Sequence, residues 1–306
     1  MSWVQDLKFR SSCFGLVAVL VVSVAVTSPS PVQATADSLT GLITSPTPQP
    51  ISDAIASLTP EDYRWIGQRI YANECASDPR YLTYWGKGEA FPSFGIGHFI
   101  WFPAGIDPPF IESFPDMLAF VSRQVAPPLW LQQLQPLHAP WQSKSQFEQA
   151  WSGRELTELR DWLFKTQSQQ AQFIVQAFET RWLNRLSALA REEQIRLSHK
   201  LSLLMASKEG TFAAIDYFNF KGIGGNAEEQ YQNEEWGLIS VLRQMSTPQK
   251  TTLSSKHTVQ EFVKAAKQRL TLRTQLAPKE RNEQRWLKGW FKRLDGYWLE
   301  DPAVNP

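Results

Sequence analysis

From Leu58 onward, apolar residues recur mostly at helical spacing, separated by short polar, Gly- or Pro-containing stretches. Apolar side chains three and four residues apart share one face of a helix, so each stretch predicts a helix that packs on a common core. Beyond the first helix and a short β segment, such stretches cover residues 114–125, 146–164, 171–189, 192–206, 211–218, 236–245, 259–272 and 278–297. The pattern therefore predicts a mainly helical chain.

The first helix has the clearest boundaries. Thr59 is a good N-cap, Pro60 suits the first helical position, and acidic residues follow in the first turn. An apolar stripe that includes Ile70 then runs to Glu74, and Asp78-Pro79 stops the helix. We expect a helix from residue 60 to about residue 75.

A small β element follows this helix. Residues 81–85 read as a strand, residues 86–88 as a turn and residues 93–101 as a partner strand. Together the patterns predict an α+β fold that is mainly α-helical, with a small β-hairpin near the start of the domain.

The N-terminus has the features of a secretory signal. Lys8 and Arg10 precede an apolar run from Cys13 to Val26, and Ala34-Thr35-Ala36 is a small-residue cleavage site. The run is too short to span a bilayer comfortably. We expect residues 1–36 to be removed, which leaves a periplasmic or secreted protein without a membrane span; an uncleaved anchor is the alternative.

Composition limits the rest of the chain. Residues 37–57 contain Pro46-Thr-Pro-Gln-Pro50 and read as an extended linker before a single domain at residues 58–306. The formal net charge is +1, which predicts no broad basic face and no nucleic-acid partner. Cys75 would be the only cysteine after cleavage, so no intrachain disulfide is expected.

Candidate chemistry gathers around the first helix and the β segment. Glu74 lies at a helix C-terminus, where the negative end of the helix dipole disfavours a further negative charge, and aromatic residues nearby could form an apolar wall. A protonated carboxylic acid in such a place could act as the general acid of a glycosidase. A solvated helix-end glutamate is the alternative.

The order of residues adds to this reading. Glu74, then Glu89, then Ser93-Phe-Gly-Ile-Gly-His98 resembles the active-site region of phage-type lysozymes and the related lytic transglycosylases. The resemblance covers residues 65–101 and implies a lysozyme-like fold without a cofactor or metal. It implies that Glu74 is the general acid, Glu89 the second carboxylate and Ser93 the residue that positions water or sugar. The spacing departs from that of the family, since Glu89 lies closer to Ser93 than the family's acidic residue does.

Several other residues are candidates for substrate binding. Trp85 could stack on a sugar and His98 follows the glycines, although core packing and a structural hydrogen-bonded role are the respective alternatives. A second segment, residues 216–237, could form the far wall of a cleft, with Asn219, Lys221 and Tyr231 facing the glycan. A glycine-rich linker between helices explains that segment equally well.

We therefore expect a cell-wall glycan-cleaving enzyme that acts on peptidoglycan or a related amino-sugar polymer, as a muramidase or as a lytic transglycosylase. The unusual spacing of Glu89 slightly favours the single-acid chemistry of a transglycosylase. Two other classes remain open. One is a glycan-binding protein without turnover, and the other is a Cys/His hydrolase built on Cys75 and His98.

Overall fold

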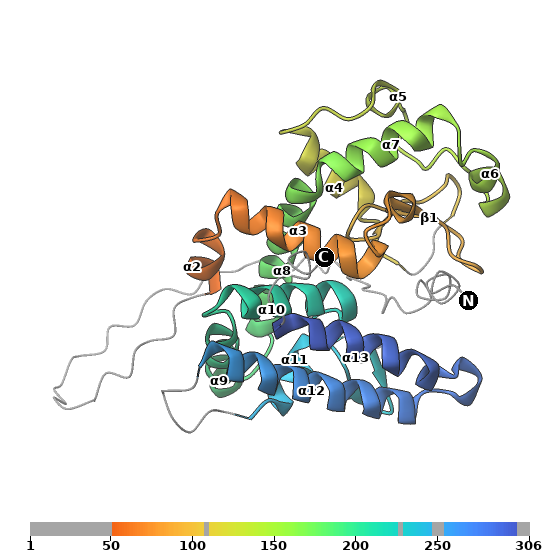
Figure 1. Ribbon diagram of the computed structural model, residues 1–306. Coiled ribbons are helices and arrows are strands. Elements are labelled where there is room, and N and C mark those ends of the chain that lie inside the picture. The colour runs from red at the N-terminus through yellow and green to blue at the C-terminus, as the bar shows by residue number, and fades with distance from the viewer. Residues whose placement is uncertain (1–50, 107–109, 226–228, 247–253, 299–306) are drawn as a thin grey trace, which may run out of the picture.

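A computed structural model describes residues 51–106, 110–225, 229–246 and 254–298 of the chain. The fold is α+β and mainly helical (Figure 1). The helices are α2 (Ile51–Ala56), α3 (Pro60–Cys75), α4 (Phe114–Ser122), α5 (Leu129–Gln132), α6 (Lys144–Gln149), α7 (Arg154–Lys165), α8 (Gln167–Ser187), α9 (Arg191–Leu204), α10 (Lys208–Lys221), α11 (Leu238–Gln244), α12 (Ser255–Leu276) and α13 (Leu287–Asp295). The strands are β1 (Thr83–Tyr84), β2 (Ser93–Phe94), β3 (Phe99–Ile100), β4 (Gln230–Tyr231) and β5 (Glu234–Glu235), and short 3-10 helices are η2 (Pro79–Leu82), η4 (Lys279–Arg281), η5 (Glu283–Trp286) and η6 (Gly296–Trp298).

The predicted start of α3 is confirmed. The Thr59 hydroxyl accepts a hydrogen bond from the Asp62 backbone amide, and the Asp62 carboxylate accepts one from the Thr59 amide, which forms a capping box. The helix ends at Cys75 because Ala76 adopts a left-handed conformation with φ 49°. Glu74 is therefore fixed in the last turn.

The β segment differs from the prediction in one respect. Residues 79–82 form η2, so β1 begins only at Thr83, and the predicted partner strand folds back to become β2 and β3. The backbone turns between them because Gly95 and His98 both have positive φ, 72° and 48°. The result is an antiparallel three-stranded sheet in the order β1-β2-β3, with Thr83 opposite Phe94.

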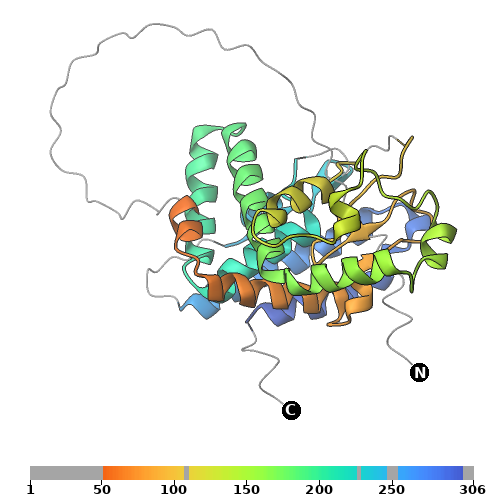
Figure 2. The same ribbon diagram turned by 90° about the horizontal axis from the view of Figure 1, so that it is seen from above.

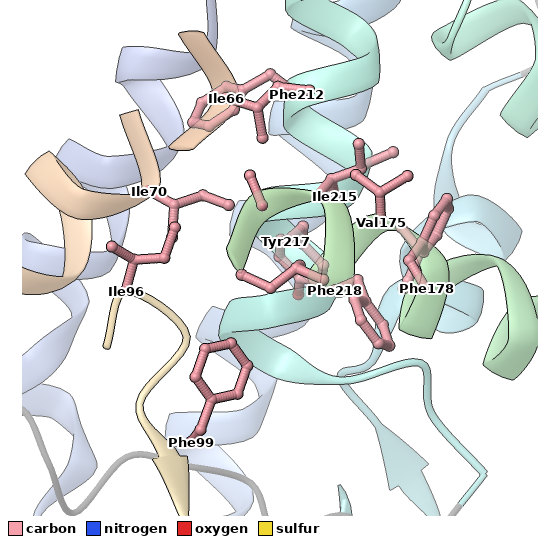
Figure 3. Close-up of a cluster of buried hydrophobic side chains, with 14 of the residues drawn as sticks. Ile66, Ile70, Ile96, Phe99, Val175, Phe178, Phe212, Ile215, Tyr217 and Phe218 are labelled. Carbon is pink, nitrogen blue, oxygen red and sulfur yellow. The ribbon is translucent and has the colours of Figure 1, made fainter. Parts of the chain in front are cut away.

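The core lies where α3, the sheet, α8 and α10 meet. In Figure 1, the sheet and α4 to α7 lie on one side of α3, and α10 to α13 lie on the other. Figure 2 shows α8 and α9 as a helical hairpin that stands out from the rest. Figure 3 shows buried side chains from all four core elements in contact: Ile66, Ile70, Ile96, Phe99, Val175, Phe178, Phe212, Ile215, Tyr217 and Phe218. This cluster sets the position of the end of α3 against the sheet and α10.

Other boundaries correct the sequence prediction. Residues 51–56, expected in the extended linker, form α2, because Ile51 and Ile55 lie one turn apart and both bury their side chains. The stretch 146–164 is two helices separated near Gly153, and 278–297 begins with two 3-10 helices. The predicted signal and residues 37–50 lie outside the described residues. Within the described ranges, no helix is both long enough and apolar enough to cross a membrane.

Candidate functional site

Three helices meet at the carboxyl group of Glu74. Its side chain is only 9% exposed, and its Oε1 atom lies 2.7 Å from Nη1 of Arg293 on α13. The Asn219 side-chain amide on α10 donates a hydrogen bond to the same oxygen, at 3.3 Å. Both contacts engage Oε1, so Oε2 is the oxygen that these two partners leave for another group.

Arg293 is shared between Glu74 and a second carboxylate, Asp216. The guanidinium donates to both Asp216 oxygens at 2.7 Å, and Asp216 is fully buried. Tyr297 also donates to Asp216 at 2.7 Å, and the Asn73 amide does so at 3.2 Å. Two carboxyl groups therefore face one guanidinium in a buried cluster.

The electrostatics of this cluster keep Arg293 charged. Burial alone would lower the pKa of Arg293, but the adjacent charges of Asp216 and Glu74 outweigh it and hold the pKa well above its usual value. One positive charge thus faces the carboxyl groups of Glu74 and Asp216.

His98 lies within electrostatic reach of the same cluster. Burial lowers the pKa of His98, the charge of Glu74 raises it and the charge of Arg293 lowers it further. The ring stacks against Tyr84, with centroids 6.5 Å apart. The neutral imidazole is favoured at this position, which fits a structural role better than that of a charged sugar ligand.

Gln170, which was not identified from the sequence, holds the Gly-Ile-Gly-His turn through a hydrogen bond. The Gln170 side chain on α8 is fully buried, and its Oε1 accepts a hydrogen bond of 2.9 Å from the Ile96 amide. Its Nε2 donates to the Leu163 carbonyl and to the Thr166 hydroxyl. A Cβ atom on Gly95 would lie 2.3 Å from the same oxygen, so glycine is required for this approach. In the sequence, the available signal for this contact was a glutamine on the apolar face of α8.

Glu89 belongs to the turn before β2. Its Oε2 accepts a hydrogen bond from the Gly86 amide at 2.9 Å, and its backbone carbonyl accepts one from the Trp85 indole at 2.8 Å. Trp85 is 3% exposed and packs edge-on against Phe147, which leaves little ring face for a sugar. Ser93 lies on β2 and is also buried. Of these three predicted residues, Ser93 lies on the sheet, whereas Trp85 and Glu89 lie between β1 and β2.

Of the three predicted residues in the second segment, only Asn219 joins Glu74. Lys221 is 1% exposed, and its ammonium group lies over the rings of Phe220 and Trp290, at 4.0 and 3.8 Å. The Tyr231 hydroxyl donates a hydrogen bond of 2.9 Å to the carboxylate of Glu283 in η5. Residues 234–235 form β5, which pairs with β4 in a second small sheet.

Arg293, Asp216 and Tyr297 were not identified from the sequence. They meet Glu74 only through long-range packing, and the stretch that contains Arg293 was predicted only as a helix that packs on the core. Asp216 did give a signal, because a single acid within the apolar run of α10 predicts a buried and paired carboxylate.

Two surface pockets lie away from Glu74. One, of about 420 Å³, is lined mainly by apolar residues of α4, α5 and the loops beside them, and the other, of about 330 Å³, lies near the starts of α3 and α10. Among the described residues, no group of three or more His, Cys, Asp and Glu side chains is placed to hold a metal ion.

Comparison with known protein families, curated proteins and solved structures finds no match to this chain.

Proposed function

We propose that the protein cleaves peptidoglycan or a related cell-wall glycan, with Glu74 as the general acid. The observation that carries the proposal is the Glu74 carboxyl itself. It lies at the end of α3 near the Gly-Ile-Gly-His turn, is 9% exposed, and is held from a single oxygen by Arg293 and Asn219. A carboxyl oriented in this way can present Oε2 to the leaving oxygen of a glycosidic bond.

The position of Arg293 supports the role of Glu74 as an acid. Asp216 accepts two hydrogen bonds from Arg293, and the same guanidinium lies 2.7 Å from Oε1 of Glu74. Proton transfer to the sugar oxygen leaves the carboxylate next to Arg293, which stabilises it.

The position of Glu89 supports a mechanism with one acid. A second carboxylate that stabilises the oxocarbenium-like state or activates water must face the sugar, whereas the Glu89 side chain closes its own turn. In a lytic transglycosylase, a hydroxyl of the sugar is the nucleophile, and Glu74 serves first as acid and then as base. We therefore favour the transglycosylase reaction over hydrolysis.

One observation favours a glycan-binding protein without turnover. In this conformation Glu74 is paired with Arg293, and an ion-paired carboxylate cannot donate a proton. The third class, a Cys/His hydrolase, is disfavoured because burial, together with the charges of Glu74 and Asp78, raises the pKa of the Cys75 thiol well above its usual value. A nucleophilic cysteine needs the opposite shift.

The test is Glu74→Gln, assayed by mass analysis of purified sacculi after digestion. The substitution keeps the shape and removes the proton, so we expect turnover to fall by roughly 10²-fold or more. The melting temperature should change little, because Arg293 keeps Asp216 as its partner.

Glu89→Gln is the matched control, since it removes a carboxylate of the same segment. We expect it to retain most of the activity, and wild-type products to carry anhydro ends. Normal turnover by Glu74→Gln would overturn the assignment of the acid. Reducing ends alone, with an inactive Glu89→Gln, would identify a two-carboxylate hydrolase. Binding of sacculi without any cleavage by the wild-type protein would support the binding protein.

A further inference from the structure

The charge of the chain is unevenly distributed. Residues 254–298 contain eleven Lys and Arg and four Asp and Glu, a net of +7, whereas the whole chain carries +1. The expectation of no broad basic face was based on the net charge of the whole chain, and this segment is more basic than that average. A basic segment within a nearly neutral protein is a candidate surface for an anionic partner.

Some of these cations point inward and are already matched. Arg273 forms a buried pair with Glu283 at 2.7 Å, and Arg293 pairs with Asp216 and Glu74. The side chains of Arg285, Lys288 and Lys292 are exposed. These three recur at spacings of three and four residues, which places them along one side of η5 and α13. We name them the α13 basic face.

This face belongs to the helix that contacts Glu74. Arg293, the neighbour of Lys292, reaches the Glu74 carboxyl from the buried side of α13. A helix is about 10 Å across with its side chains, so the exposed cations lie on the order of one helix diameter from the acid. Figure 1 shows α13 beside α12, whose Lys264 is also exposed. A long polymer could contact both the acid and this face.

The face lacks the apolar residues that a bilayer partner would need. The large exposed hydrophobic side chains of the described residues are Leu129, Phe164, Leu183 and Ile195, none of them in residues 254–298. The Trp286 ring is covered by the Arg285 guanidinium at 4.8 Å, and the Phe291 ring has the Lys267 ammonium at 5.2 Å. Helices that bind a membrane surface insert exposed apolar side chains into it. This face lacks them among the described residues, so it is suited to binding a hydrated anionic partner.

We infer that the α13 basic face binds carboxylate groups of the glycan that Glu74 cleaves, so the substrate is an anionic cell-wall polymer and not a neutral amino-sugar chain. The inference rests on the proposed function. The cations hold carboxylates of the strand, or of peptides attached to it, and keep the strand near the acid.

The test compares two triple variants of the full chain in co-sedimentation with purified sacculi. The first is Arg285→Gln, Lys288→Gln and Lys292→Gln. The second, matched in charge, is Lys165→Gln, Arg191→Gln and Arg196→Gln, which removes three exposed cations from α7 and α9. We expect the first to bind sacculi roughly tenfold more weakly or worse at low salt and the second within about twofold of wild type. The difference should shrink at high salt.

Two further substrates sharpen the result. Sacculi whose carboxyl groups have been amidated, and chitin, which is neutral, should bind wild type and the first variant alike. Equal losses in both triple variants, or unchanged binding of the first, would overturn the inference even if wild type cleaves sacculi. Selective loss by the first variant, with no cleavage by wild type, would uphold the face and reject the glycosidase. If the first variant bound anionic phospholipid vesicles more weakly than wild type but bound sacculi normally, the partner of this face would be a membrane surface. That result would overturn the inference.

Discussion

At the scale of single residues, the surroundings of His98 lower the pKa of its imidazole. Burial lowers its pKa, and Glu74 and Arg293 act on it in opposite directions. In the unfolded chain a histidine has a pKa near 6.5. As the pH falls below that value, the unfolded state binds a proton that the folded state does not accept. The contribution of His98 to stability is therefore complete above about pH 6.5 and is lost on acidification.

We expect His98→Asn to flatten the acid side of the stability curve. Asparagine tolerates the left-handed backbone of this position, where φ is 48°. One group contributes a slope of at most about 1.4 kcal/mol per pH unit. Urea unfolding between pH 7.5 and pH 5 should show wild type losing stability faster than the variant. Parallel curves would mean that His98 takes up its proton equally well in both states.

At the scale of elements, the contact between α8 and the turn after β2 depends on one missing side chain. A Cβ atom at Gly95 would lie 2.3 Å from Gln170 Oε1, in a backbone with φ 72°. Gly88 offers a comparison, because its φ is 84° and a Cβ atom there would meet nothing within 4 Å. Both substitutions carry the cost of a left-handed alanine, and only one adds a clash.

Gly95→Ala should lower the free energy of unfolding by roughly 2–4 kcal/mol, and Gly88→Ala by about 1 kcal/mol. Chemical denaturation measures both. Combining Gly95→Ala with Gln170→Ala should cost less than the sum of the two single changes, because the second substitution removes the clash. Strict additivity would contradict a direct contact between the two residues.

The sequence predicted elements wherever the determining interactions are local. The capping box that starts α3 involves residues three positions apart and was found directly. The helix at 51–56 was missed because the neighbouring prolines suggested an extended linker. The sequence predicted one strand over residues 93–101, where the structure has β2 and β3. The turn between them was missed because it depends on Gln170, which is 74 residues from Ile96.

The candidate site divides in the same way. Glu74 could be proposed from the sequence because its helix and the glycine-containing segment are near neighbours in the chain. Arg293 and Asp216 could not, because α10 and α13 reach the end of α3 only after the whole core has formed. Trp85 and Tyr231 were considered as sugar contacts on residue type, but exposure is a property of the packed molecule.

At the scale of the whole molecule, Asp216 joins segments from both ends of the described chain. On α10, it accepts hydrogen bonds from Asn73 at the end of α3, Arg293 on α13 and Tyr297 in η6. Removing one partner of a buried ion pair typically costs 3–5 kcal/mol, because the remaining charge stays buried. Arg293 would retain Glu74, which offsets part of this cost.

We therefore expect Asp216→Asn to lower the free energy of unfolding by roughly 2–4 kcal/mol. Asp295→Asn is the control, since this residue is 44% exposed and pairs with Lys267 at the surface, and it should cost at most about 1 kcal/mol. Hydrogen exchange should show protection lost in α13 and at the end of α3 together, because Asp216 connects them. The Asp216→Asn and Glu74→Gln double variant should be less stable than the sum of the single changes, since Arg293 then has neither carboxylate. A loss confined to α10, or strict additivity in the double variant, would show that the three segments hold together without this cluster.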